Sequence, residues 1–175
     1  MPTDILNINT LHDLLDHDAR KFSSGEAQLK SILPKWIDVA GSVALKGALQ
    51  AYLAQAKLNA KSLQDFILHE NIGAQVRLNK VMQSLIKEIR EKLSNCTNDK
   101  VRDACLLASI QAINHYKISQ YGTAAAFAKA IGSLHYADVF HEAELKEVFI
   151  DGQLTSIAEK EINREAMAPL SLSAS

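Results

Sequence analysis

The 175-residue sequence has few residues that break helices or close tight turns, with 7 glycines and 3 prolines in all. Sandwiches and barrels of many strands need turn residues at short intervals, so these counts disfavour both folds. No stretch approaches the roughly 20 uninterrupted apolar residues of a membrane-spanning helix. The start, MPTDILNINT, has no basic segment followed by an apolar one, as a secretory signal would. We therefore expect a cytoplasmic protein that has no membrane partner.

Cysteine and net charge are also scarce. Cys96 and Cys105 are too few for a disulfide scaffold and do not form a CxxC pair, so we expect two reduced thiols. The 19 basic and 20 acidic residues leave a net charge of -1. Because nucleic-acid binding needs a concentrated positive surface, we expect no nucleic-acid partner. No glycine-rich phosphate loop and no Ser or Cys nucleophile motif is present, so the sequence indicates no catalytic residue and gives no reason to expect a hydrolytic enzyme.

What the sequence does contain is long segments rich in Ala, Leu, Lys, Gln and Glu, which lose little side-chain freedom in a helix. Capping residues and glycines divide these segments into helices expected at about 10–40, 42–70, 79–93, 100–131 and 133–167. Pro34 predicts a kink in the first of them. Long helices joined by short connections predict an all-α, ferritin-like four-helix bundle, with an additional short helix between the second and third long helices.

The expected domain organisation is simple. One bundle domain covers residues 10–167, between a flexible N-terminal segment, 1–9, and a flexible C-terminal tail, 168–175. No internal repeat indicates a solenoid or a second domain.

Each long helix carries polar residues on the same face as its apolar stripe. These residues are Glu26, Gln55, Asn59, Asn114, Glu144, Glu147 and Asp151, with His115 immediately beside Asn114. A carboxylate in an apolar core is unfavourable unless it is paired, hydrogen-bonded or bound to a metal. Ferritin-like di-iron and di-manganese centres take one such group or more from each of four facing helices. The pattern predicts a metal site at the centre of the bundle, either intact or ancestral.

Three segments carry a more specific pattern. They are residues 26–36 (EAQLKSILPKW), 101–108 (VRDACLLA) and 115–123 (HYKISQYGT). They resemble the patterns E-x-Q-L-x-x-x-L-P-K, V-R-D-A-x-L-x-A and E-H-Y-E-I-x-x-Y-G-T of the YciE/YciF stress-protein family, and the match extends in register over nearly the whole chain. The resemblance implies a ferritin-like bundle, a bacterial cytoplasmic stress protein, a homodimer and a suspected di-metal site.

The resemblance also implies which metal ligands remain. Candidate ligands in this sequence are Glu26, His115, Glu147 and Asp151. Gln55 stands where the second-helix pattern H-L-E-E-T has a carboxylate, and Asn114 replaces the acid of E-H-Y. The acid that follows E-H-Y in the family is Lys117 here.

Charge arithmetic separates two interpretations of this incomplete site. Two divalent ions bring about +4 into a site that offers roughly -2 to -3, against about -4 in an intact tetracarboxylate centre. We therefore expect no resident cofactor, with Gln55 and Asn114 hydrogen-bonded to the remaining carboxylates, in a stress protein with a structural or protective role. The alternative is a di-iron or di-manganese oxidoreductase that acts on peroxide or oxygen, using iron or manganese at Glu26, Glu147, Asp151 and His115.

Overall fold

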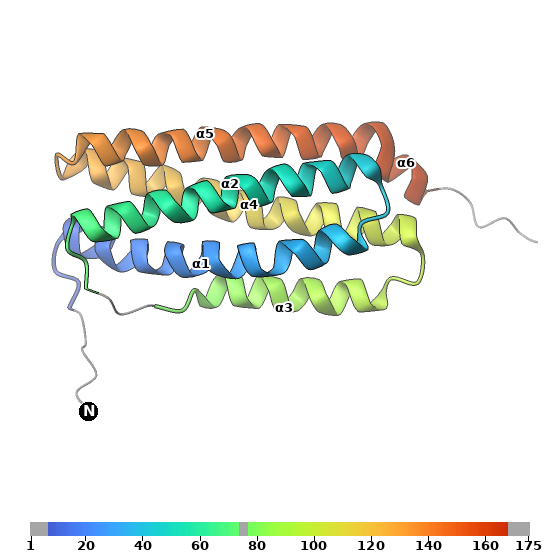
Figure 1. Ribbon diagram of the computed structural model, residues 1–175, viewed down its shortest axis with the longest axis horizontal. Helices are drawn as coiled ribbons and strands as arrows, with labels where there is room; N and C mark the ends of the chain where they lie inside the picture. The colour runs from blue at the N-terminus through green and yellow to red at the C-terminus, as the bar shows by residue number, and fades with distance from the viewer. Residues whose placement is uncertain (1–6, 74–76, 168–175) are drawn as a thin grey trace, which may run out of the picture.

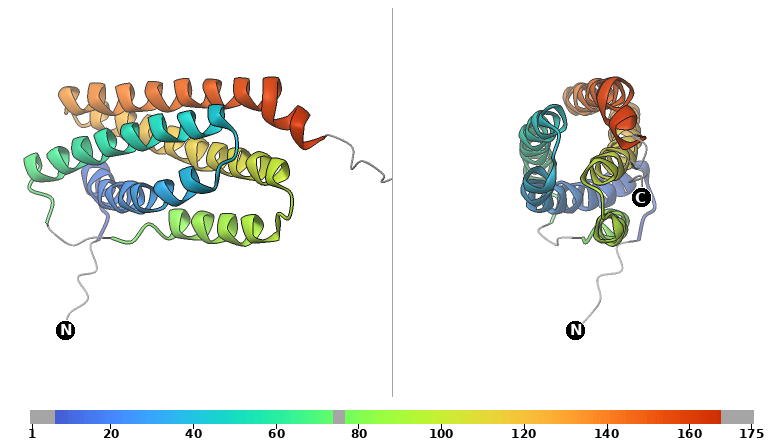
Figure 2. Two further views of the ribbon diagram at one scale, coloured as in Figure 1. Left: turned by 45° about the vertical axis from the view of Figure 1, so that its right-hand side comes forward. Right: turned by 90° about the vertical axis from the view of Figure 1, so that its right-hand side faces the viewer.

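The computed structural model describes residues 7–73 and 77–167, and these form helices without a strand (Figure 1). The elements are α1 Leu11–Val39, α2 Val43–His69, α3 Lys80–Asn95, α4 Asp99–Ala130, α5 Leu134–Ile157, the π-helical turn η1 Ala158–Ile162 and α6 Asn163–Ala166. Helices α1 and α2 form one hairpin, α4 and α5 form another, and α1 packs against α4 and α2 against α5 (Figure 2). The short helix α3 lies outside this bundle, along α1 and α4. The predicted four-helix bundle with one additional short helix is confirmed.

The predicted helix ends agree with the structure at most positions. Thr10 caps α1 through a capping box, because its hydroxyl accepts from the Asp13 amide at 3.1 Å and its own amide donates to the Asp13 carboxylate at 2.9 Å. Asn98 caps α4 by accepting from two first-turn amides. Gly132, with φ of 83°, follows α4 in the left-handed conformation that glycine adopts readily. Helix α1 continues through Pro34 to Val39.

The last helix differs from the expected single helix over 133–167. Helix α5 ends at Ile157, and the π-helical turn η1 separates it from α6. A π-turn adds a residue to the turn and rotates the side chains that follow it. In this orientation Glu161 of η1 accepts a hydrogen bond from the hydroxyl of Ser42, which caps α2 at the same end of the bundle. The interaction joins residues 119 positions apart, so local sequence patterns did not predict it.

The apolar interior consists of two clusters. One includes Leu29, Leu33, Leu45, Ile113 and Leu154, and the other includes Leu15, Phe22, Leu63, Ala124 and Phe140. On each helix of the bundle, buried polar residues lie between the members of the first cluster and those of the second. A polar layer therefore crosses the interior of the bundle.

Helix α3 is attached through its N-cap residue. Asn79 is 2% exposed, and its side chain accepts from the Met82 amide at 2.9 Å and donates to the Lys21 carbonyl of α1 at 3.2 Å. Its backbone amide donates to the Ser24 hydroxyl at 3.2 Å. Asn79 thus caps α3 and joins it to α1. This close approach requires Gly25, since a Cβ there would lie 2.8 Å from Asn79 Nδ2.

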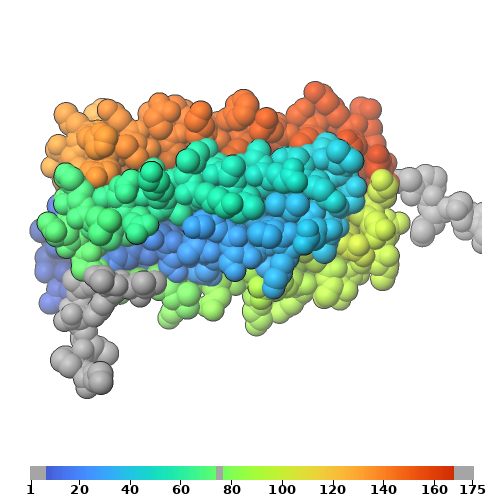
Figure 3. All heavy atoms as spheres, in the orientation of Figure 1, coloured from blue at the N-terminus to red at the C-terminus, as the bar shows by residue number. Residues whose placement is uncertain are grey.

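In the space-filling view, α5, α2, α1 and α3 lie one below the other across this face (Figure 3). Among the described helices, none is long and apolar enough to cross a membrane. The flexible tail expected over 168–175, and residues 1–6 of the expected N-terminal segment, lie outside the described residues.

Gly25→Ala is expected to lower the free energy of unfolding by about 1 kcal/mol or more, even though alanine favours a helix, because the new methyl group displaces the hydrogen-bonded Asn79. The matched control is Gly47→Ala in α2, where a Cβ meets nothing within 4 Å and stability should rise by about 0.5–1 kcal/mol. Urea unfolding followed by circular dichroism measures both changes. Equal stabilisation by the two substitutions would contradict the role given to Gly25.

Candidate functional site

The polar layer contains a cluster of buried side chains drawn from all four helices of the bundle. We call it the central cluster, and its members are Glu26 of α1, Tyr52 and Asn59 of α2, Asn114, Lys117 and Tyr121 of α4, and Glu147 of α5. Each member is at most 3% exposed. Carboxylates and an ammonium group are rarely buried this deeply unless they are paired.

Lys117 joins the two carboxylates of the cluster. Its Nζ lies 3.0 Å from Glu26 Oε1 and 2.6 Å from Glu147 Oε1. The same atom lies 4.7 Å from the centroid of the Tyr52 ring, where a cation is attracted to the aromatic face. One positive charge thus balances part of the charge of two carboxylates that approach each other from α1 and α5.

Amide groups complete the surroundings of Glu147. Asn59 Nδ2 donates to Glu147 Oε1 at 2.9 Å, and Asn114 Nδ2 donates to Oε2 at 2.7 Å and to the Glu147 carbonyl at 3.0 Å. Gln55 Nε2 donates to Asn59 Oδ1 at 2.8 Å and so orients the amide that faces the carboxylate. Both oxygens of the buried Glu147 carboxylate therefore accept hydrogen bonds.

In contrast to Glu147, only one of the two carboxylate oxygens of Glu26 accepts hydrogen bonds from the described residues. Its Oε1 accepts from the Tyr121 hydroxyl at 2.6 Å and from Asn59 Nδ2 at 3.4 Å. Its Oε2 is buried and has no hydrogen-bond partner among the described residues. Burial raises the pKa of Glu26, and the charge of Glu147 raises it further, while the charge of Lys117 opposes the change. The surroundings of Glu26 therefore favour proton uptake by its carboxyl group.

Lys117 and the two tyrosines of the cluster hold their protons strongly. Burial alone would lower the pKa of Lys117, but the charges of Glu26 and Glu147 raise it above its ordinary value. The pKa values of Tyr52 and Tyr121 lie well above the ordinary range, because burial and the neighbouring carboxylates disfavour a phenolate. The cluster therefore contains an ammonium ion and two neutral phenols at physiological pH.

The structure places the candidate ligands from the sequence in two groups. Glu26 and Glu147 belong to the central cluster. His115 and Asp151 pair with each other at 3.1 Å nearer the surface, where their side chains are 65% and 24% exposed. Asp151 also accepts from Gln111 Nε2 at 3.3 Å. The side chains of His115 and Asp151 therefore do not share the buried contacts of the carboxylates.

The two amides at expected acid positions also differ in their contacts. Asn114 donates to Glu147 as expected, whereas Gln55 contacts Asn59 rather than a carboxylate. Lys117, which stands at the position of a family acid, lies between Glu26 and Glu147, and the sequence pattern alone does not predict this placement. Its place on the buried face was predictable in principle, because Asn114, Lys117 and Tyr121 follow the spacing of three and four residues that marks one helix face.

Within residues 7–73 and 77–167, no group of three or more His, Cys, Asp or Glu side chains is arranged to hold a metal ion. The central cluster contains two carboxylates, which is fewer than such a group needs, and an ammonium ion lies between them.

Comparisons with known proteins match the chain to a family. The sequence profile of DUF892, described as a domain of unknown function, matches residues 10–167. Protein YciF of Escherichia coli strain K12 is 29% identical over 162 residues, which are 92% of this chain and 98% of that protein.

Two solved structures resemble the whole bundle. The crystal structure of the Escherichia coli stress protein YciF matches with a TM-score of 0.84 at 28% identity, covering 90% of this chain and 99% of that one. YcfI of Rhodopseudomonas palustris matches with a TM-score of 0.83 at 25% identity and the same coverage. The resemblance therefore extends over the helices that carry the central cluster.

Lys117→Met is expected to lower the free energy of unfolding by about 3–5 kcal/mol at neutral pH, because it leaves two buried carboxylates without their cation. The deficit should shrink as the pH falls and the carboxylates take up protons. Chemical unfolding at several pH values measures both effects. Lys57→Met on the exposed side of α2 is the control and should change stability little. A loss at Lys117 no larger than the loss at Lys57 would contradict the ion-pair assignment.

The stability of the protein should fall as the pH rises above about 10. Lys117, Tyr52 and Tyr121 keep their protons to higher pH when folded than at the ordinary values of 10.5 and 10.0 that apply to the unfolded chain. The folded state then binds more protons, so each group contributes a loss of up to about 1.4 kcal/mol per pH unit in that range.

Urea unfolding across this alkaline range tests the expected slope. Tyr121→Phe removes one of the titrating groups and should make the slope shallower. A free energy of unfolding that stays level or rises above pH 10 would show that the folded state does not hold these protons.

Proposed function

Because the chain belongs to the DUF892 family, we propose that it is a ferritin-like stress-response protein of the YciF type, with a structural or protective role rather than an enzymatic one. The relative YciF is described as a stress protein and YcfI as a candidate structural protein. The proposal includes a homodimer in the bacterial cytoplasm, without a nucleic-acid partner. It also includes a degraded di-metal site at the centre of the bundle.

The observation that carries this proposal is the position of Lys117. Its ammonium group lies within 3.0 Å of one oxygen of each buried carboxylate, Glu26 and Glu147. A divalent cation placed between these carboxylates would have to displace the ammonium group or lie beside it. Like-charge repulsion in a buried site makes either arrangement unfavourable.

The other donors of the central cluster support the same conclusion. Ferritin-like di-metal centres take a glutamate from each of four helices and a histidine from two of them. Here α2 contributes Asn59 and α4 contributes Asn114, whose amides donate hydrogen bonds to Glu147. Neutral amides do not compensate the charge of a metal ion. The residues present therefore do not fit a di-metal centre.

The alternative function is a di-iron or di-manganese oxidoreductase acting on peroxide or oxygen, with Glu26, Glu147, Asp151 and His115 as ligands. The contact between His115 Nε2 and Asp151 Oδ1, at 3.1 Å, provides a carboxylate and an imidazole on neighbouring turns of α4 and α5. This pair would have to move inward, and Lys117 outward, before all four side chains could share a metal.

Elemental analysis separates the two functions. Protein produced in medium rich in iron and manganese should carry less than roughly 0.2 ion per chain, since two carboxylates already share an ammonium ion. A content of about two ions per chain, together with peroxide consumption by the purified protein, would favour the oxidoreductase.

A rebuilt variant tests whether the cluster corresponds to the family's metal position. Lys117→Glu combined with Asn114→Glu restores both acids of the pattern E-H-Y-E, and the variant should be stabilised by Mn²⁺ while the parent is not. The matched control is Lys61→Glu with Gln64→Glu, which makes the same change of charge at the same spacing on the exposed face of α2. If Mn²⁺ stabilises the control as much as the rebuilt variant, the central cluster is not the metal position.

A further inference from the structure

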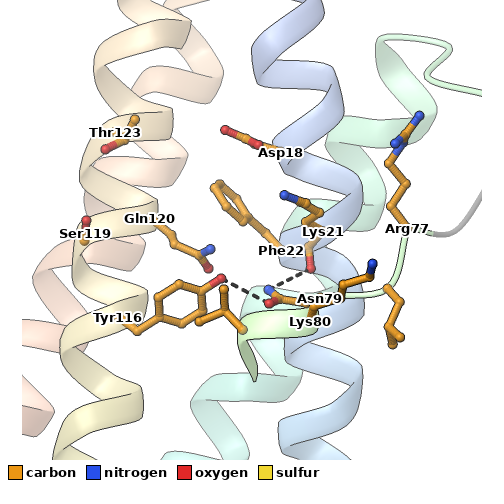
Figure 4. Close-up of a pocket in the computed structure, with 12 residues that line it drawn as sticks. Asp18, Lys21, Phe22, Arg77, Asn79, Lys80, Tyr116, Ser119, Gln120 and Thr123 are labelled. Carbon is orange, nitrogen blue, oxygen red and sulfur yellow. Dashed lines mark hydrogen bonds between the residues drawn. The ribbon is translucent and has the colours of Figure 1, made fainter. Parts of the chain in front are cut away.

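A second feature lies outside the bundle core, where the chain enters α3. A pocket of about 510 Å³ opens between α1, α4 and residues 77–81 (Figure 4). Phe22 lines it from α1 and Tyr116 from α4, and Figure 4 shows Arg77 and Lys80 on the side opposite Tyr116. This volume lies within the range of about 300–1,000 Å³ that is usual for small-molecule sites.

The pocket is locally positive in a chain whose net charge is -1. Lys21, Arg77 and Lys80 line it, against one carboxylate, Asp18. Among the described residues, no carboxylate lies within 4.0 Å of these three cationic groups, whereas Asp18 contacts His17 Nδ1 at 3.0 Å. The lining therefore carries a surplus of two positive charges that described acidic residues do not pair.

Hydrogen bonds fix one wall of this pocket in place. The Tyr116 hydroxyl donates to Asn79 Oδ1 at 3.1 Å, and Asn79 Nδ2 donates to the Lys21 carbonyl at 3.2 Å (Figure 4). Burial raises the pKa of Tyr116, so the phenol stays a donor at physiological pH. Lys80 begins α3, whose first-turn amides place the positive end of the helix dipole at the same wall. Helices α1, α3 and α4 are thus joined around a preformed hollow.

The rest of the lining suits a ligand that has an uncharged part in addition to its charged group. Phe22 and Tyr116 provide aromatic surface, and Ser119, Gln120 and Thr123 of α4 provide polar groups along one edge. Two lysines and a guanidinium group match a phosphate dianion, because guanidinium binds its oxygens in pairs and ammonium groups bind as point charges. Aromatic side chains next to such a cationic group favour a flat ring.

We propose that this pocket binds a small phosphorylated molecule that carries a flat ring, of the nucleoside monophosphate class. The phosphate lies against Lys21, Lys80 and Arg77, and the ring lies against Phe22 and Tyr116. This site shares no residue with the central cluster, so it does not depend on the proposed stress-protein function or on the presence of a metal.

Isothermal titration of the full chain with AMP, inorganic phosphate and adenosine, each alone and at low salt, tests the proposal. AMP should bind at least about tenfold more tightly than either phosphate or adenosine, because it satisfies both halves of the pocket. Absence of AMP binding, or AMP affinity no greater than that of phosphate, overturns the proposal.

Matched variants locate the site. Lys21→Gln with Lys80→Gln should weaken AMP binding by about tenfold or more, since both changes remove cations from the lining. Lys87→Gln with Arg90→Gln removes the same charge from the neighbouring groove between α1 and α3 and should leave the affinity unchanged. Equal weakening by the two double variants indicates general charge attraction and overturns the proposal.

An independent substitution covers the case in which the lysine variant does not fold. Ser119→Glu places a carboxylate at an exposed position of α4 that lines the pocket, and it should abolish AMP binding by repelling the phosphate. Thermal unfolding confirms that the variant is folded before titration. Unchanged AMP affinity in a folded Ser119→Glu protein overturns the proposal.

Discussion

The ion pairs of Lys117 with Glu26 and Glu147 determine which charged groups can be buried together at the centre of this bundle. Two carboxylates buried on facing helices require a positive charge, and here that charge is covalently attached to α4. Tyr121, Asn59 and the other amides then arrange their donors around the carboxylates. The ammonium group supplies positive charge to the two buried carboxylates, as a metal ion would.

The fold was predictable because its signals are local. Capping residues such as Thr10 and Asn98, and the glycine at 132, mark helix ends through contacts within a few residues. The first four helices therefore begin and end within about two residues of the expected positions. The π-turn after Ile157 was not predicted, because the contact of Glu161 with Ser42 that accompanies it joins opposite parts of the chain. Local periodicity contains no information about such a contact.

The central cluster was predictable only in part. Helical spacing identified Glu26, Asn59, Asn114 and Glu147 as inward-facing, and the structure buries all four. The sequence identified Lys117 as the residue at a family acid position but did not predict its burial, because a lysine is ordinarily assigned to the surface, although it has the spacing of its buried neighbours. For His115, the helical pattern fixes its neighbours along α4 but not the depth of the side chain, which the packing of α5 against α4 determines. The charge balance of a buried site therefore has to be counted over every residue on the buried face of each helix, including a lysine.

The polar layer between the two apolar clusters has a consequence for how the helices find their alignment. Contacts between apolar side chains tolerate a shift of one helix along another, because one leucine can take the place of another in an apolar contact. Charged groups do not, because a helix displaced by one turn would move Lys117 away from both carboxylates and leave each ion facing hydrocarbon. The cluster therefore fixes the register of the helices, as a single buried asparagine does in some coiled coils. In a bundle of long and chemically similar helices, a buried charged cluster selects one axial register among several that bury nearly equal apolar surface.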